Sequence, residues 1–337
     1  MKYSVIVPVF NRPDEAGELL ESLTAQTFKD FEVIIVEDGS TVPCEDVVKR
    51  YADKLNLHYF AKPNSGPGPS RNYGVERASG DYVLILDSDV VLPPGYLAAV
   101  ETELAQNACD AFGGPDRAHA SFTPMQKAIN YAMTSFFTTG GIRGGKKKMD
   151  KFYPRSFNMG VRRATYAELG GFAPMRFGED IDFSTRIFKA GRSCRLFPEA
   201  WVWHKRRTDL RKFFRQVHNS GIARIHLTKR HPGTLKLVHL LPAVFTLGCF
   251  LLVVLALVAL LVGCPHWYVL FSPFVLFALV IFADATRLEH SVGVGLRAIV
   301  AAFVQLWGYG SGFLRAWWVR LVLRRGEFEA FKNNFYK

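Results

Sequence analysis

The chain has 337 residues, 49% of them hydrophobic, and a formal net charge of +12 at pH 7. This length allows one large domain or two smaller ones with a substantial core. No stretch interleaves basic and aromatic residues like a known nucleic-acid-binding module, so we expect no nucleic-acid partner despite the charge. The basic clusters lie near apolar segments, which favours contact with anionic lipid, although any one cluster is more typical of a solvated surface.

Strand and helix patterns alternate from residue 1 to about residue 232. The expected strands are Tyr3–Phe10, Phe31–Val36, Leu57–Phe60 and Asp81–Leu86. The expected helices between them are Asp14–Thr27, Pro43–Asp53 and Pro69–Ala78. We expect Asp14 to cap the first of these helices. Repeated strand-helix-strand units predict an α/β domain over residues 1–232, built on a mainly parallel sheet that is covered on both faces. Ligands of such sheets bind beyond the carboxyl ends of the strands.

The remaining residues, 233–337, are predicted to form a membrane-associated helical region. Leu237–Gly263 is apolar over more than the roughly 20 residues that cross a bilayer, and Trp267–Ala283 is near the lower limit. A tight linker joins the two, so we expect a helical hairpin. A third segment, Gly293–Leu314, contains Arg297 and several glycines and is followed by arginines. If it crossed the membrane, those arginines would lie outside, against the positive-inside tendency, so we expect an interfacial or re-entrant helix.

The cysteines and the N-terminus bear on the compartment. The five cysteines are scattered, and none has the spacing of a paired metal site, which is typical of reduced thiols in the cytosol. The first apolar run is too short for a secretion signal and leads directly into a strand. We therefore expect the first domain and the C-terminus on the cytoplasmic side of the cytoplasmic membrane.

Two aspartates, Asp87 and Asp89, follow the fourth predicted strand one residue apart. In an extended or turning backbone such residues can project the same way and converge on one hard cation. Mg²⁺ or Mn²⁺ held by one or two carboxylates keeps positions open for the oxygens of a diphosphate. The alternative is that Asp87 caps a turn and Asp89 caps the next helix, near Pro93. The position after a buried strand favours the metal interpretation.

The loop Asn64–Pro69 is rich in glycine and proline and precedes a helix that carries Arg71 near its start. Amides at a helix start suit a phosphate, and Arg71 adds positive charge. The loop matches neither a dinucleotide-binding fingerprint nor a Walker loop, so an ordinary turn is the alternative.

A set of motifs in a fixed order resembles the family 2 glycosyltransferases of the GT-A fold, over roughly the first 230 residues. The upstream motifs are Val7–Arg12, Val36–Ser40, Asn64–Gly74 and Asp87–Asp89. The downstream motifs are Phe157–Gly160, Gly170–Phe172 and Phe177–Phe183. The combination is far more specific than any one motif. It implies an inverting enzyme that uses a nucleotide-sugar donor.

The resemblance also implies roles for residues on the nucleotide side. Pro8 and Phe10 match positions that line the nucleobase, and Asp38 matches the residue that bonds the base. Arg71 matches a contact to base or phosphate. Glu37 stands where the family more often has aspartate, which leaves its role open.

On the sugar and metal side, Asp87 matches the donor-sugar or ribose contact, and we place Ser88 beside it in the donor site. Asp89 matches the main protein ligand of Mn²⁺ or Mg²⁺. His204 follows the next strand pattern, where related enzymes sometimes place a metal or diphosphate ligand. The alternative for His204 is a surface histidine before a basic run.

On the acceptor side, the resemblance makes Asp180 the general base and places Asn158, Gly178 and Glu179 near the acceptor. Inversion needs a base on the face of the sugar opposite the departing diphosphate. A carboxylate at the start of a helix is stabilised in its ionised form by the amides there. The alternative is that Glu179, Asp180 and Asp182 are ordinary acids at a helix start.

Two further segments bear on the acceptor. Gln216–Ser220 stands where processive members of the family carry Gln-x-x-Arg-Trp, and the departure favours transfer of one sugar per encounter over polymerisation. The glycine-rich basic loop Gly140–Lys148 suits closure over substrate or contact with lipid phosphate. A solvated loop without such a role is the alternative.

These features predict a metal-dependent, inverting glycosyltransferase at the cytoplasmic face of the membrane. It would move one sugar from a UDP- or GDP-sugar to a hydroxyl of a lipid-linked glycan, in surface-polysaccharide or glycoconjugate assembly. One alternative is a polyprenyl-phosphate sugar synthase, against which the Gly-Glu-Asp motif counts because attack by a phosphate needs no base. The other is a non-catalytic membrane scaffold, against which the intact acidic set counts.

Overall fold

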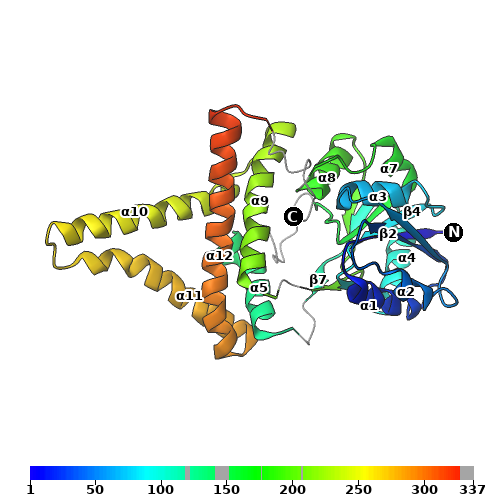
Figure 1. The fold of residues 1–337 in the computed structure, drawn as a ribbon, viewed down its shortest axis with the longest axis horizontal. Helices are drawn as coiled ribbons and strands as arrows, with labels where there is room; N and C mark the ends of the chain where they lie inside the picture. Colours follow the sequence, from blue (N-terminus) through cyan, green and yellow to red (C-terminus); the bar gives the residue numbers. More distant parts are fainter. Residues whose placement is uncertain (118–121, 141–151, 176, 206–207, 327–337) are drawn as a thin grey trace. The chain divides into compact units, whose positions relative to one another are not determined.

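The computed structural model describes residues 1–117, 122–140, 152–175, 177–205 and 208–326. Its described residues divide into two compact units (Figure 1). The first comprises 1–117, 152–175 and 177–205, and the second comprises 122–140 and 208–326. This division falls before helix α9 (Leu210–Arg230), whereas the sequence placed a boundary near residue 232. Helices α5 (Pro124–Thr134) and α6 (Phe136–Thr139) also belong to the second unit.

The first unit is built on a seven-stranded sheet with the order β3-β2-β1-β4-β8-β6-β9. Its parallel half consists of β1 (Tyr3–Val9), β2 (Phe31–Asp38), β3 (Leu57–Lys62) and β4 (Tyr82–Leu86). Strand β8 (Asn158–Arg162) runs antiparallel between β4 and β6 (Ala111–Gly113), and β9 (Cys194–Leu196) is parallel to β6. The predicted α/β class with a mainly parallel sheet is confirmed.

Two hydrophobic clusters cover the two faces of this sheet. Along β1, Val5 and Val7 belong to one cluster and Ile6 to the other, because successive side chains of a strand point to opposite faces. Helices α1 (Pro13–Thr24) and α4 (Tyr96–Gln106) pack on the first face. Helices α3 (Pro67–Val75) and α8 (Glu179–Lys189) pack on the second. The short helices α2 (Glu45–Lys49) and α7 (Arg163–Glu168) complete this unit.

The prediction that Asp14 caps α1 is wrong. The residue at the N-cap position is Arg12, and Pro13 occupies the first helical turn. Proline suits that place because its fixed φ is already helical and no N–H is lost there. Asp14 therefore lies inside the first turn, where its negative charge interacts favourably with the helix dipole.

A small second sheet brings residue 204 back to the end of β4. It has the order β5-β10-β7, formed by Val90–Val91, Val202–His204 and Asp116–Arg117. Strand β10 pairs antiparallel with β5, so that His204 lies opposite Val90. The backbone N–H of Lys205 also donates to the carbonyl of Asp89 at 3.0 Å. This pairing places His204 beside the aspartates that follow β4.

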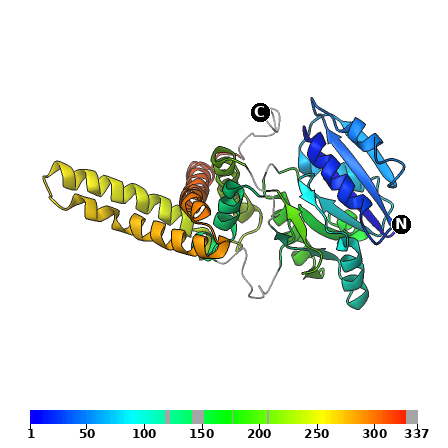
Figure 2. The ribbon, with the colours of Figure 1, turned by 90° about the horizontal axis from the view of Figure 1, so that it is seen from below.

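The second unit contains three helices that are long and apolar enough to cross a membrane, judged by length and composition. They span Leu241–Leu261, Trp267–Glu289 and Val292–Val322. The first is α10; the second joins the 3₁₀ segment η2 (Trp267–Phe271) to α11 (Ser272–Glu289). Figures 1 and 2 show α10 and α11 as a hairpin, as predicted. A further 3₁₀ turn, η1 (Leu237–His239), precedes α10.

The third helix, α12 (Val292–Trp317), continues without a break into a π-helical turn η3 (Trp318–Val322). A re-entrant segment would have to turn back, so that alternative is wrong, whereas an interfacial position stays a prediction. The glycines of this segment allow close packing. A Cβ on Gly312 would lie 2.0 Å from the His218 carbonyl oxygen of α9, and one on Gly310 would lie 2.3 Å from the Pro242 carbonyl oxygen of α10.

Gly160 in β8 provides a test of the packing of the first unit, because a Cβ there would lie 2.0 Å from Cζ of Phe112. We expect Gly160→Val to lower the free energy of unfolding by about 1–3 kcal/mol, the usual cost of overpacking a core. Thermal unfolding of the purified protein, followed by intrinsic fluorescence, measures this. Gly95→Ala is the control, since no atom lies within 4 Å of its added Cβ; equal effects of the two changes would contradict the described packing.

Candidate functional site

The predicted donor residues gather at the carboxyl ends of the parallel strands. Pro8 lies in β1 beside Val36 of β2, Phe10 follows β1 directly, and both side chains are half-buried. Asp38 is the last residue of β2, and Asp87 follows the last residue of β4. Ser88 is buried in the turn between Asp87 and β5. The edge of the sheet thus collects these residues from three strands, as expected for an open α/β sheet.

Asp87, Asp89 and His204 form a cluster that can hold a metal ion. Their ligand atoms all lie within 4.8 Å of one another. Nε2 of His204 is 3.2 Å from Oδ1 of Asp89, and its ring stacks on Phe157 with centroids 4.7 Å apart. Two carboxylates and an imidazole are a donor set that suits Mn²⁺ and, through the carboxylates, Mg²⁺. The three residues therefore fit a divalent cation.

Arg12 is a neighbour of this cluster that the sequence did not single out. Its guanidinium lies 2.9 Å from Oδ2 of Asp89 and 2.8 Å from Oε2 of Glu15. The loop after β1 carries it to the same edge of the sheet as the aspartates after β4. Its place directly after the first strand motif was the signal that could have found it. The arginine balances part of the negative charge that the cluster concentrates.

Asp38 is bound almost entirely by the chain itself and is 2% exposed. Its carboxylate accepts hydrogen bonds from the amides of Ser65 at 2.9 Å and Gly66 at 2.8 Å, and it forms an ion pair with Lys62. Gly39, at φ +71°, leaves room for this loop because a Cβ there would lie 2.6 Å from the backbone nitrogen of Asn64. Asp38 therefore anchors the loop before α3; its predicted contact with the base stays a prediction.

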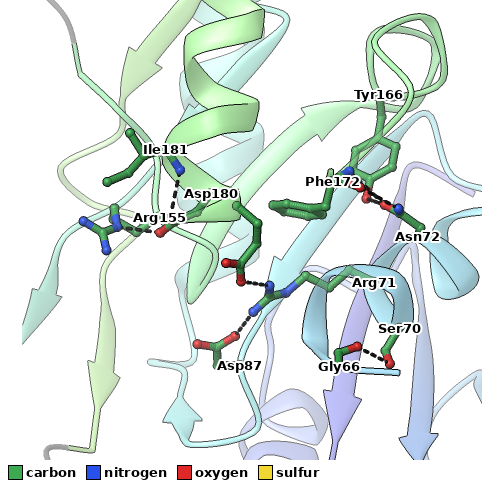
Figure 3. A network of polar contacts seen from close by, with 11 residues as sticks. Gly66, Ser70, Arg71, Asn72, Asp87, Arg155, Tyr166, Phe172, Asp180 and Ile181 are labelled. Atoms are coloured by element: carbon green, nitrogen blue, oxygen red, sulfur yellow. Dashed lines mark hydrogen bonds and ion pairs between the residues drawn. The ribbon is translucent and has the colours of Figure 1, made fainter. Parts of the chain in front are cut away.

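Arg71 joins the donor side of the site to α8. One terminal nitrogen donates to Oδ1 of Asp87 at 2.7 Å (Figure 3). The other donates to Oε1 of Glu179 at 3.0 Å. Its guanidinium is 5.2 Å from the centre of the Phe172 ring, and the residue is 3% exposed. The arginine compensates two carboxylates whose elements are far apart in the sequence. Its predicted contact with base or phosphate stays a prediction.

The Gly170–Phe172 motif is shaped around Asn72. Oδ1 of Asn72 accepts from the Tyr166 hydroxyl at 2.6 Å and from the Phe172 amide at 2.9 Å. Gly171, at φ +62°, is required because a Cβ there would lie 2.5 Å from that oxygen. Figure 3 shows Asn72, Tyr166 and Phe172 in this arrangement. Asn72 lies in a predicted motif, but the sequence assigned it no role. In the structure, its bond to the Phe172 amide holds the Phe172 ring against the Arg71 guanidinium.

Helix α8 begins with the two acids of the Gly-Glu-Asp motif. Gly178, at φ +83°, precedes the helix, and Glu179 and Asp180 are both buried. Oδ2 of Asp180 accepts from Nε of Arg155 at 2.6 Å, and Oδ1 accepts from the Ile181 amide at 2.8 Å.

The two acids have opposite titration behaviour. Burial alone would raise the pKa of Asp180, but the Arg155 guanidinium and the Ile181 amide outweigh it and hold that pKa below its ordinary range. Burial raises the pKa of Glu179, and the neighbouring Asp180 charge adds to the rise despite Arg71. Asp180 is thus the member of the pair that is held as an anion.

Asn158, which was predicted to lie near the acceptor, is buried, and that role stays a prediction. It is 1% exposed, its Oδ1 accepts from the Tyr96 hydroxyl at 2.7 Å, and its Nδ2 donates to the Ala200 carbonyl at 2.8 Å. These bonds tie β8 to α4 and to the segment before β10. The basic loop predicted at 140–148 lies, apart from Gly140, outside the described residues.

Comparison with known proteins gives this unit a family. Residues 4–170 match the family model described as glycosyl transferase family 2. This part of the chain is a family 2 glycosyltransferase domain. The match ends before α8, so that Asp180 and His204 lie beyond it.

Similar proteins extend the comparison of the family 2 domain. A pre-mycofactocin glycosyltransferase of Mycobacterium tuberculosis is 31% identical over 68% of this chain and 48% of its own length. The poly(ribitol-phosphate) β-N-acetylglucosaminyltransferase TarS of Staphylococcus aureus is 43% identical over 26% of this chain and 16% of its own length. The chain thus spans about half or less of these relatives.

Among solved structures, the mannosyltransferase PcManGT of Pyrobaculum calidifontis, in complex with GDP-Man and Mn²⁺, superposes with a TM-score of 0.63. It is 20% identical, and the alignment covers 91% of this chain and 87% of that one. The likeness shows a shared fold, and the predicted GT-A fold of the family 2 domain is confirmed.

The Arg71 bridge leads to a stability prediction. We expect Arg71→Met to lower the free energy of unfolding by about 3 kcal/mol, the lower end for a broken buried pair, because the buried Glu179 carboxyl loses its partner while Asp87 is 32% exposed. Denaturant unfolding measures the change. Arg77→Met is the control, since Arg77 pairs with an exposed glutamate, and its cost should stay within about 1 kcal/mol. A similar cost for both would contradict a bridging role.

Proposed function

We propose that the protein transfers one sugar from a nucleotide-diphosphate sugar to an acceptor hydroxyl, with inversion at the anomeric carbon. The observation that carries this proposal is the Arg71 bridge, which joins the cluster of Asp87, Asp89 and His204 to the helix start that bears Asp180. Such a reaction needs a cation site for the departing diphosphate and an anionic base for the acceptor hydroxyl. The family 2 domain and its fold likeness to a GDP-Man-binding mannosyltransferase support the donor class.

On the donor side, Asp87, Asp89 and His204 would hold Mn²⁺ or Mg²⁺. The bound cation supplies positive charge to the departing diphosphate. Arg12, already at the edge of this cluster, adds a guanidinium that can bind phosphate oxygens. Pro8 and Phe10 supply half-buried apolar surface at the end of β1 for the nucleobase. A donor with UDP or GDP fits this description.

On the acceptor side, Asp180 would take the proton of the attacking hydroxyl. A base must be ionised before it can accept, and the lowered pKa of Asp180 keeps it ionised at neutral pH. The carboxylate is also held at a defined place by bonds to both oxygens. Arg71 holds the first residue of α8 at a set distance from the donor residue Asp87. These contacts support a base that is held at a defined place relative to the proposed donor site.

We further propose a lipid-linked glycan as the acceptor, at the cytoplasmic face of the membrane, in surface-polysaccharide or glycoconjugate assembly. Three helices suited to a membrane support this, because they would confine the enzyme to the plane in which such lipids lie. The arginines at and beyond the end of α12 favour a cytoplasmic C-terminus, so that, with a cytoplasmic first domain, α10 and α11 would cross the membrane and α12 would lie at its interface.

The base assignment can be tested by transfer from labelled UDP- and GDP-sugars to lipid extract in membranes. We expect Asp180→Asn to lower the rate about 10²- to 10⁴-fold, the usual contribution of a general base, with donor binding retained. Glu76→Gln, which changes an exposed acid, should transfer at the wild-type rate. Near-full activity of Asp180→Asn would favour a polyprenyl-phosphate sugar synthase, and label only on soluble acceptors would contradict a lipid-linked acceptor.

The metal assignment can be tested without turnover, by calorimetry of Mn²⁺ with UDP or GDP. We expect Asp89→Asn to weaken Mn²⁺ binding about tenfold or more, since even changes to the partners of metal ligands typically cost 10- to 100-fold. The control is Asp81→Asn, an exposed acid at the other end of β4. Metal-independent or absent nucleotide binding by the wild type would support a non-catalytic scaffold.

A further inference from the structure

We propose that Arg155 is a positioning residue for the transfer, which holds the Asp180 carboxylate as an anion and in one orientation. The inference rests on the proposed function, because it assigns Arg155 a task toward the proposed base. The sequence motifs do not include Arg155. The family model matches residues 4–170, a range that includes Arg155, but it assigns no role to any residue. It belongs to the segment just before β8, a part of the chain 25 residues away from Asp180.

The geometry holds the carboxylate from both sides. Nε of Arg155 donates to Oδ2 of Asp180 at 2.6 Å, and the Ile181 amide donates to Oδ1 at 2.8 Å (Figure 3). Each oxygen is engaged once, and a carboxylate oxygen has a second lone pair that can accept a proton. The two bonds therefore leave Asp180 able to act as a base while they restrict rotation of its carboxylate. A charged hydrogen bond of this kind is among the stronger ones in proteins.

Arg155 itself is held in place by its backbone. The hydroxyl of the fully buried Ser184, on α8, donates to the Pro154 carbonyl at 3.0 Å. The Asn158 amide donates to the Arg155 carbonyl at 2.9 Å, in an isolated bridge that leads into β8. The segment is thus fastened both to the helix that carries Asp180 and to the sheet. These contacts hold the backbone from which the Arg155 guanidinium reaches Asp180.

The other charges near Asp180 do not replace Arg155. Arg71 of α3 acts on Asp180 at longer range, while its own hydrogen bonds go to Asp87 and Glu179. On the same helix, the Asp180 charge raises the pKa of Glu179, so Glu179 is the acid of the pair that takes up a proton more readily. Asp116 of β7 raises the pKa of Arg155 and so favours its charged form. Without Arg155, burial would favour the protonated form of Asp180.

The consequence is a specific pH signature. A base works only in its deprotonated form, so activity falls as the pH drops through its pKa. Removal of Arg155 raises that pKa and moves the fall to higher pH. The loss of activity should therefore be large at acidic pH and small at alkaline pH, where Asp180 is deprotonated even without Arg155.

The experiment compares kcat/KM of wild type, Arg155→Gln and Arg155→Lys across pH, in the transfer assay described above. Near pH 6 we expect Arg155→Gln to lose about tenfold or more, and the loss to shrink toward about pH 9, since one pKa unit is a tenfold change in protonation. The KM for the donor should stay within about twofold, because the donor site is not touched. Arg155→Lys should restore much of the acidic limb, since it keeps the charge.

The matched control is Arg195→Gln, which removes an ion pair of similar exposure between Arg195 and Glu103, away from Asp180. A loss in Arg155→Gln that is constant with pH, or that follows its thermal unfolding relative to this control, would overturn the inference. A pH profile of Arg155→Gln identical to that of the wild type would also overturn the inference. If Asp180→Asn is nearly as active as wild type, the proposed function fails instead, whatever Arg155→Gln shows. A dead Asp180→Asn with an unshifted Arg155→Gln profile defeats the positioning role alone.

Discussion

The ion bridge of Arg71 is the interaction on which the candidate site depends. It spans from Asp87, after β4, to Glu179, the first residue of α8, and both bonds are made by one buried guanidinium. A buried cation of this kind is tolerable only if its partners are placed accurately, because an unpaired charge in the interior is costly. The bridge thus constrains the carboxyl end of β4 and the start of α8 to one relative position.

The surrounding contacts support that constraint from several sides. Asn72, one residue along α3, fixes the Gly171 turn and thereby sets Phe172 against the Arg71 guanidinium. Asp38 holds the loop that leads into the same helix. Charges therefore alternate through the site from Asp87 to Arg71, to the acids of α8, and on to Arg155. Such alternation lets a buried site keep several ionised groups, because each carboxylate has a cation within hydrogen-bonding distance.

The second unit follows a different principle, in which small residues let helices approach closely. Gly308 and Gly312 of α12 face Val217 and His218 of α9, and Gly310 faces the start of α10. Tyr131 of α5 donates to Asp284 of α11 at 2.7 Å, which adds a polar contact to the same assembly. The sequence alone assigned these glycines no role. In the structure they mark close backbone contact, as is common between helices of membrane proteins.

The linear pattern of residues was enough to predict the alternation of strands and helices, the parallel sheet, the two apolar segments of the hairpin and the place of Asp87 and Asp89 after β4. These depend on local periodicity and on the rule that parallel strands end at one edge, both of which are visible in a linear chain. The folded structure was needed to show that Arg12 contacts Asp89, 77 residues away, that Arg155 contacts Asp180, and that Arg71 contacts two carboxylates. It also showed that α5 and α9 belong to the second unit, together with the apolar helices. Ion pairs and close helix contacts depend on how distant elements pack, and no local pattern encodes which partner a long charged side chain will reach.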